Sequence, residues 1–180
     1  MCALQSHRLY DAASPRNVTS LPLSARLALS ISEAANKRGI YMGPRSTKYH
    51  VALYRWSGGR LGGHLPGMPG ARILLLDHAG RKSGVRRTSP VMYHREGEVV
   101  AVVASKAGQP TNPAWFHNLM ANPDTTVQIG REVREVRARV ATDEERAQLW
   151  PKFVAFYPGY SFYERLATGR TIPIVILDPR

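Results

Sequence analysis

"ARILLLDHAGRKSGVRRTSPVMYHREGEVVAVV", residues 71–103, contains three apolar segments separated by short polar turns. The first, residues 71–79, is largely apolar and predicts a strand buried on both faces. Two more strands follow it, joined by a tight turn at Glu96-Gly97. Strands joined by turns this short pair in antiparallel fashion, so the stretch predicts an antiparallel sheet.

The residues before this stretch predict one helix, one strand and one loop. Residues 23–37 place apolar side chains on one helical face, and Gly39 suits the end of that helix. "KYHVALYRW", residues 48–56, is rich in β-branched and aromatic residues and predicts a strand. Residues 57–70 hold six glycines and two prolines, which is typical of a loop.

The residues after it predict alternating helices and strands. A short helix is expected with Asn112 as its N-cap and Pro113 at its first helical position. Two strands are predicted within residues 125–141, with a turn near Gly130. A helix follows, which begins at the T-x-x-E capping box of Thr142 and Glu145. A last strand is predicted over residues 171–177.

Six or seven antiparallel strands in a chain of 180 residues would most naturally curl into a barrel. The predicted class is therefore α+β, mainly β. We expect a poorly ordered arm over residues 1–20, an amphipathic helix within residues 21–42 and one barrel domain over residues 43–180.

The composition favours anionic partners in a reducing compartment. The chain has 25 Lys and Arg against 13 Asp and Glu, a formal net charge of +12, so nucleic acid, anionic lipid and phosphorylated cofactors all stay open. Cys2 is the only cysteine, which excludes a disulfide framework and a thiolate metal cluster. Without a secretory signal or an apolar run of eighteen residues, a cytoplasmic protein, soluble or peripheral, is expected.

The hairpin turn "AGRKSGVRR", residues 79–87, is the first candidate site. Arg81, Lys82, Arg86 and Arg87 fall within seven positions that contain no acidic residue. Together with the backbone N–H groups of residues 80–84, these side chains can converge on one oxyanion. The alternative is a solvated basic loop. So many cations on one rim of a barrel would be costly without a ligand, which favours the site.

Two further segments could contact an aromatic ligand. Ser105 and Lys106 could bond a ring heteroatom or a phosphate, and Trp115 could form a flat apolar wall, unless it is simply a core residue like Phe116. The tyrosines Tyr157, Tyr160 and Tyr163 are spaced by three around a Pro-Gly break. They could line a lid and protonate a substrate oxygen, or they could be structural.

The sequence contains no motif for metal binding, for a catalytic nucleophile or for a phosphate-binding loop. The six histidines are scattered without metal-ligand spacing, and we expect no metal site. A nucleophile elbow and a phosphate-binding loop ending in GK[ST] are also absent. By elimination, the chemistry would belong to a bound organic cofactor that the protein orients.

These segments resemble the deazaflavin-dependent nitroreductase family of actinobacteria. The likeness runs from residue 48 to residue 179 and includes "ILLLDHAGRKSGVRRTSPVMY", "VVASKAGQPTNPAWFHNL" and "FVAFYPGYSFYERLATGRTIPIVIL". The resemblance implies a split β-barrel of the flavin mononucleotide-binding type. It also implies a bound reduced coenzyme F-420, an 8-hydroxy-5-deazaflavin that carries a phosphate and an acidic oligoglutamate tail.

The resemblance also implies roles for particular residues. Those implied to hold the phosphate and tail are Arg81, Lys82, Ser83 and Arg87. Those implied to contact the deazaflavin are Pro90, Ser105, Lys106, Pro113 and Trp115. The substrate side is implied to consist of Tyr157, Tyr160, Tyr163 and Met92, where Met92 departs from the tyrosine of the family. Tyr157, Tyr160, Tyr163 and Ser105 are the expected catalytic residues.

The leading functional hypothesis is hydride transfer from the reduced deazaflavin to a quinone such as menaquinone, with nitroaromatic compounds as further acceptors. Because such quinones reside in membranes, residues 23–37 could contact the inner face of the cell membrane, or they could pack on the barrel. One alternative is a flavin mononucleotide oxidoreductase on the same barrel. Nucleic-acid binding is a weaker alternative, because the cations gather near two loops and no nucleic-acid motif is present.

Overall fold

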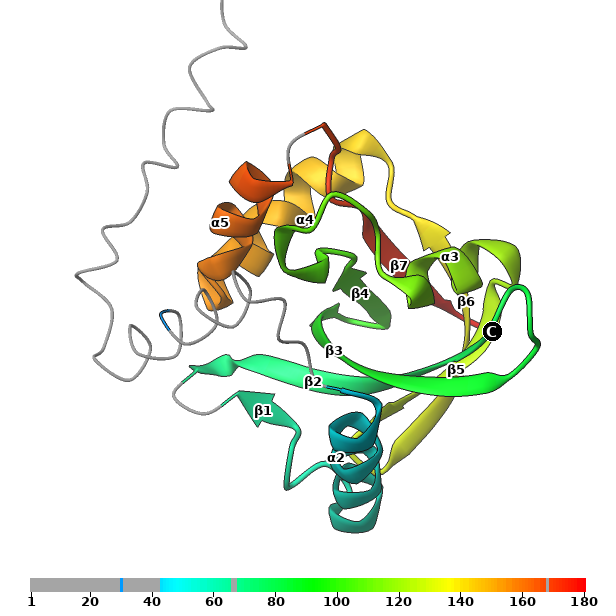
Figure 1. Cartoon of the computed structure of the whole chain (residues 1–180). Helices are drawn as coiled ribbons and strands as arrows, with labels where there is room; N and C mark the ends of the chain where they lie inside the picture. The colour runs from blue at the N-terminus through cyan, green and yellow to red at the C-terminus, as the bar shows by residue number, and fades with distance from the viewer. Residues whose placement is uncertain (1–29, 31–42, 66–67, 168) are drawn as a thin grey trace, which may run out of the picture.

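A computed structural model describes Ser30 and residues 43–65, 68–167 and 169–180 of the chain (Figure 1). The predicted arm over residues 1–20 and, apart from Ser30, the predicted helix within residues 21–42 lie outside the described residues. The structure of the remainder is built around one sheet, which decides where the candidate site residues lie.

Six antiparallel strands close into a barrel. Their order is β2 (Met68–Ala79), β3 (Arg86–Glu96), β4 (Val99–Val103), β7 (Ile174–Pro179), β6 (Glu132–Val140) and β5 (Asp124–Ile129). Pairing of β5 with β2 closes the ring, and the two-residue strand β1 (His64–Leu65) extends β2 outside it. The predicted antiparallel barrel, its hairpin turn after Glu96 and its turn at Gly130 are confirmed.

The long apolar runs in the sequence arise because β2, β4 and β7 are buried on both faces. In β4, Val100 and Val102 belong to one core cluster, whereas the alternate residues Ala101 and Val103 belong to a second. The first cluster includes residues from all six barrel strands and from α3 (Ala114–Ala121). The second packs against α4 (Asp143–Phe156) and α5 (Gly159–Leu166), which cover the outer face of β4 and β7.

Two predicted helix starts have different outcomes. The capping box of α4 is confirmed, because the Thr142 hydroxyl accepts from the Glu145 backbone N–H and the Glu145 carboxylate accepts from that of Thr142. The start predicted for α3 is wrong by one residue: Pro113 is the N-cap and Ala114 the first helical residue. The Asn112 side chain instead accepts a hydrogen bond from Arg170 at 2.6 Å.

The predicted strand over residues 48–56 is wrong, because these residues belong to helix α2 (Pro44–Ser57). Pro44 occupies the first turn, and Gly58 ends the helix in the left-handed conformation at φ 60°. The N–H groups of Gly58 and Gly59 satisfy the last carbonyls of the helix. The predicted loop over residues 57–70 is likewise interrupted by β1 and by the start of β2.

Candidate functional site

The hairpin between β2 and β3 has a well-defined backbone. The Gly80 N–H donates to the Val85 carbonyl at 2.9 Å, and the Gly84 N–H donates to the Gly80 carbonyl at 2.7 Å. Gly84 adopts φ 65°, which an L-residue rarely adopts. The loop over residues 80–85 is therefore a closed turn that presents the side chains of residues 81–87 to solvent.

A buried polar chain ties this loop to helix α3. The Arg81 N–H donates to Asn118 Oδ1 at 3.0 Å, and Asn118 Nδ2 lies 2.9 Å from His78 Nδ1. Because the amide oxygen of Asn118 already accepts, its Nδ2 donates to Nδ1 of His78, and the proton of the neutral ring lies on Nε2. That Nε2–H then donates to Ser89 Oγ at 3.0 Å. In this tautomer His78 cannot take a proton from Ser89, so the chain is a brace rather than a catalytic triad.

His78 is neutral at neutral pH, as its hydrogen bond from Asn118 requires. Burial, with a smaller contribution from the charge on Arg87, lowers the pKa of His78 below its usual value of 6.5. The neutral ring is the form that can accept from Asn118. The brace is therefore intact at neutral pH.

The cations of this loop have no acidic partner among the described residues. Arg81, Lys82, Arg86 and Arg87 are exposed, and the ion pairs of the described chain all lie elsewhere. The predicted contribution of the backbone is smaller than expected, because four of the N–H groups between residues 80 and 85 donate within the protein. Only those of Lys82 and Ser83 lack an acceptor within the described part of the chain. Side chains must supply most of the contacts to an anion.

The second predicted segment follows β4 and has a strained backbone. Ser105 is half-buried, and the short helix η2 (Lys106–Gly108) begins after it. Lys106 and Ala107 adopt φ values of 46° and 51°, the left-handed region that side chains disfavour. Such strain persists where the surroundings hold it in place, and it is common at ligand sites. The Lys106 ammonium donates to the Thr111 hydroxyl at 2.8 Å.

Arg170 holds this segment in place, and sequence analysis did not identify it. Its guanidinium donates to the carbonyls of Ser105 at 2.8 Å and Gln109 at 2.9 Å, and to the Asn112 side chain. Partial burial lowers the pKa of Arg170 from its usual value of 12.5. No motif signals this role, because the contacts join residues more than 55 positions apart in the sequence.

The remaining residues predicted to contact the cofactor ring are less exposed than the loop cations. Pro113 and Pro90 are half-buried, and Pro90 lies opposite Leu75 in the β2–β3 pair. Trp115 is only 8% exposed and packs in the barrel core beside residues such as Leu119. This is the position expected if Trp115 is a core residue. Any contact between Trp115 and a cofactor would use the small exposed fraction of its ring.

The three predicted tyrosines form one cluster in the core that adjoins α4 and α5. Tyr157 follows α4, Tyr160 and Tyr163 belong to α5, and all three are buried. The hydroxyls of Tyr157 and Tyr163 lie 2.9 Å apart, whereas that of Tyr160 has no hydrogen-bond partner among the described residues. Burial raises the pKa of Tyr160, so its hydroxyl keeps its proton. Met92 is half-buried and packs against the core cluster that contains these tyrosines.

Helix η2 connects this tyrosine cluster to the other candidate segments. Ala107 packs against the cluster, and a Cβ on Gly108 would lie 2.9 Å from the Tyr163 carbonyl oxygen. Helix α3 follows directly after this segment and carries Asn118, which holds the basic loop. The sequence-predicted segments are thus linked in the order basic loop, α3, η2 and α5.

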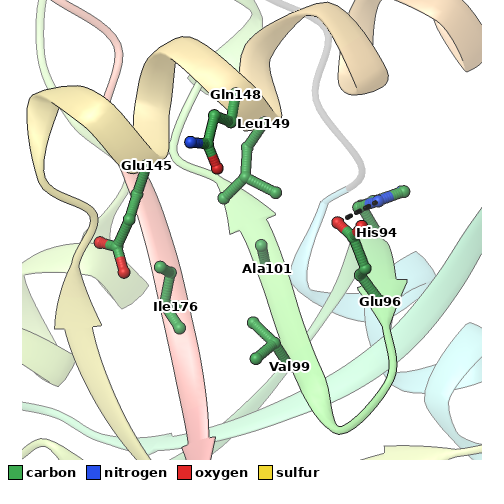
Figure 2. A pocket seen from close by; sticks show the side chains of 8 residues that line it. All are labelled: His94, Glu96, Val99, Ala101, Glu145, Gln148, Leu149 and Ile176. Atoms are coloured by element: carbon green, nitrogen blue, oxygen red, sulfur yellow. Dashed lines mark ion pairs between the residues drawn. The ribbon is translucent and has the colours of Figure 1, made fainter.

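A separate cavity of about 180 Å³ lies beneath α4 and contains none of the predicted site residues (Figure 2). Its polar side chains are those of His94, Glu96, Glu145 and Gln148, and residues of β4 and β7 such as Ala101 and Ile176 lie next to them. Glu96 and Glu145 already pair with Lys152 and Arg139. A volume this small would not hold a tricyclic ring system, since ligand pockets measure roughly 300 to 1,000 Å³.

Within the residues that the structure describes, no three His, Cys, Asp or Glu side chains group closely enough to hold a metal ion. None of the helices in this part of the chain is both long and apolar enough to cross a bilayer.

Comparison with known sequences points to one family. The model of a family described as F420H(2)-dependent quinone reductase matches residues 46–179. A putative F420H(2)-dependent quinone reductase of Mycobacterium tuberculosis is 48% identical over 107 residues, 59% of this chain and 89% of the relative. A second M. tuberculosis protein, named an F420H(2)-dependent quinone reductase, is 36% identical over 143 residues, which cover 78% of this chain and 94% of the relative.

Two solved structures are similar to this chain. One described as an F420-H2-dependent reductase is 40% identical, with a TM-score of 0.55 over 59% of this chain and 93% of its own. Another, described as a domain-swapped dimer, is 34% identical, with a TM-score of 0.58 over 74% of this chain and 96% of its own. Both likenesses cover most of the matched structure.

Proposed function

The chain belongs to the F420H(2)-dependent quinone reductase family, and from that premise we propose that it transfers a hydride from reduced coenzyme F-420 to a quinone such as menaquinone. The match over residues 46–179 is the observation that carries the proposal. Nitroaromatic compounds are secondary acceptors in this view, because a nitro group can accept the same hydride.

The basic loop fits the acidic end of the coenzyme. Arg81, Lys82 and Arg87 are exposed cations without acidic partners among the described residues, and Ser83 adds a hydroxyl. Phosphate and carboxylate groups are the ligands that such a cluster binds best. The brace through Asn118 supports this role, because it fixes the loop backbone before any ligand arrives and so reduces the entropy lost on binding.

The segment after β4 would hold the ring of the coenzyme. Ser105 and Lys106 can form hydrogen bonds with ring heteroatoms, and Pro90, Pro113 and the exposed part of Trp115 can make apolar contacts. The left-handed backbone at Lys106 and the three bonds from Arg170 support a rigid platform. A rigid platform matters because hydride transfer requires donor and acceptor carbons to be held close together.

The tyrosine cluster would serve the acceptor. When bound, the reduced coenzyme would supply the hydride, and one further proton is needed to complete reduction of the quinone to the quinol. The Tyr160 hydroxyl is protonated and has no partner among the described residues, so it can donate to a quinone oxygen. The paired hydroxyls of Tyr157 and Tyr163 can extend that hydrogen bond, and Met92 packs beside the cluster and would influence which acceptors fit.

The remaining parts of the proposal concern location and the alternative cofactor. Menaquinone is a membrane lipid, so the enzyme would work in the cytoplasm at the inner face of the membrane, where residues 21–42 could provide a contact. Flavin mononucleotide also joins a tricyclic ring to a phosphate and is the competing cofactor. It lacks the acidic tail, so it would use fewer of the loop cations.

A side-by-side titration tests the proposal. Fluorescence quenching should give a much lower Kd for coenzyme F-420 than for flavin mononucleotide. The reduced coenzyme should be oxidised when menaquinone or a short-chain analogue is added, as followed by the return of its visible absorbance. Tighter binding of flavin mononucleotide, or no oxidation with any quinone, would reject the proposed reaction.

A further inference from the structure

Helix α2 carries an aromatic and apolar stripe on its outward face. Tyr49, Leu53 and Trp56 are spaced by four and then three residues, which places them on one side of the helix. Tyr49 is 78% exposed and Trp56 is 82% exposed, with Leu53 at 44%. Solvated apolar surface of this extent is unfavourable and commonly marks a binding surface.

The opposite face of α2 fixes the stripe in this orientation. The Tyr54 side chain is 1% exposed, and its hydroxyl donates to the Ile73 carbonyl at 3.0 Å. The same hydroxyl accepts from the Gly130 N–H at 2.9 Å, so Tyr54 connects α2 to β2 and to the β5–β6 turn. The helix lies against the outside of the barrel, at the opposite side from α4 and α5 (Figure 1). It cannot turn its stripe inward without breaking these bonds.

The charges around the stripe have one sign. Arg45 lies four residues before Tyr49 and so shares the exposed face, while Lys48 flanks it and Arg60 follows the helix. All three are exposed, and none forms an ion pair with a described residue. The helix itself contains no acidic residue. Arg55 is different, because it pairs with Asp77 at 3.3 Å.

We propose that this stripe, with Arg45, Lys48 and Arg60, is a docking surface for an anionic lipid bilayer. Tryptophan and tyrosine favour the interface between headgroups and acyl chains, and neighbouring cations are attracted to anionic headgroups. A second copy of the chain fits less well, because two such faces would bring like charges together. The surface is distinct from the contact expected for residues 21–42. The biological purpose rests on the proposed function, since a docked enzyme can reach a membrane-resident quinone.

Co-sedimentation with vesicles tests the docking surface on the full-length chain. The parent protein should bind vesicles containing phosphatidylglycerol and bind pure phosphatidylcholine weakly. Replacing Tyr49 and Trp56 by Ser should lower the vesicle partition coefficient about tenfold or more, because two large side chains lose their burial. Val133→Ser removes a 64% exposed apolar side chain on β6 and is the matched control, with no change expected. Equal binding of the double variant and the parent would overturn the proposal.

Two further readouts distinguish a lipid partner from a second protein chain. Trp56 is by far the most exposed of the three tryptophans, since Trp115 is buried and Trp150 half-buried, so its emission should shift to the blue on anionic vesicles. A Trp56→Phe variant should lose that shift yet still bind. Absence of a shift in the parent, or concentration-dependent dimerisation that the double variant abolishes, would contradict a lipid partner.

An assay with a water-soluble quinone distinguishes failure of the proposed reaction from failure of the docking surface. The double variant should still oxidise reduced coenzyme F-420 with a water-soluble quinone at the parent rate, because neither Tyr49 nor Trp56 belongs to the candidate site. A parent that binds vesicles but reduces no quinone would reject the reaction and leave the docking surface standing.

Discussion

Two groups of arginines in this protein have opposite surroundings. On strand β6, Arg134 pairs with Glu132 and Glu98, and Arg137 pairs with Asp124. In the hairpin loop after β2, the cations from Arg81 to Arg87 have no acidic partner among the described residues. The same residue type therefore has two uses, holding strands and turns together where it is paired and remaining available to an anionic ligand where it is not.

Pairing with arginine changes the pKa of the carboxylate partner. Arg139 bonds the Glu145 carboxylate through two nitrogens at 2.7 and 2.8 Å, and this contact lowers the pKa of Glu145 to about 2. The carboxylate stays charged at any physiological pH. The loop cations instead act on an uncharged neighbour, since Arg87 contributes to the lowered pKa of His78.

A similar contrast exists among the tyrosines, and it leads to the largest expected effect. Tyr157 and Tyr163 pair with each other, whereas Tyr160 has no hydrogen-bond partner among the described residues. Replacing Tyr160 by Phe should lower turnover with a quinone about 100-fold, because one proton donor is lost. The Kd for the coenzyme should change little, and thermal unfolding should occur near the parent temperature because the ring still fills the core. Unchanged steady-state kinetics would remove Tyr160 from the proposed mechanism.

The loop cations give the second effect. Lys82→Ala and Arg87→Ala should each weaken binding of coenzyme F-420 by about 1.5 to 3 kcal/mol, because each removes a charge-assisted hydrogen bond. Fluorescence titration at fixed ionic strength measures the change. Arg137→Ala on β6 removes the same kind of charge from a paired site and should leave the Kd within about twofold. If all three variants weaken binding equally, the effect is the net charge of the protein rather than a site.

The barrel was predictable because its strands leave little ambiguity. Both faces of β2, β4 and β7 are buried, so the sequence shows uninterrupted apolar runs between turn residues. Helix α2 was not predicted, because two of the aromatic residues that suggested a strand, Tyr49 and Trp56, lie on its outward face. Its inward face contributes Tyr54 and few other large apolar side chains. The Pro44 and Gly58-Gly59 positions were the signals of a helix start and end.

The candidate site was predictable only in part for a related reason. Four clustered cations are visible in any sequence, so the loop was found. Asn118 and Arg170 are single polar residues whose partners lie about 40 to 65 positions away, and only the closed barrel brings them together. Residues that brace a site leave no local pattern, whereas residues that contact a charged ligand often do.

Asn118 gives the third prediction, because it connects the unpaired loop to the packed body of the protein. Asn118→Leu keeps the side-chain size but leaves His78 Nδ1 and the Arg81 N–H without partners. The free energy of unfolding should fall by about 1 to 3 kcal/mol in urea titrations. Affinity for the coenzyme should fall by less than in Lys82→Ala, because the cations remain. Full affinity and full stability together would show that the brace has no role.

The pH dependence of stability tests the same brace without changing Asn118. Since the folded-state pKa of His78 lies below 6.5, the unfolded chain binds more protons as the pH falls through 6.5, and stability declines. Stability is therefore fully present above pH 6.5 and is lost as the pH falls through the folded value. His94 has a lowered pKa for a similar reason, so His78→Gln should reduce this slope rather than remove it. Urea unfolding between pH 5 and 7.5 measures the slope, and a slope identical to that of the parent would contradict the assignment.

The smallest effect is expected where the arginines are already paired. Arg137 bonds both oxygens of Asp124 at 2.9 and 3.0 Å, but its side chain is 61% exposed, so water and salt screen the interaction. Arg137→Ala should cost no more than about 1 kcal/mol of stability, and less in high salt. Arg180 also approaches Asp124, at 3.6 Å, and can partly replace the lost partner. A cost above that of Asn118→Leu would mean that paired surface arginines, rather than the buried polar brace, govern the stability of the barrel.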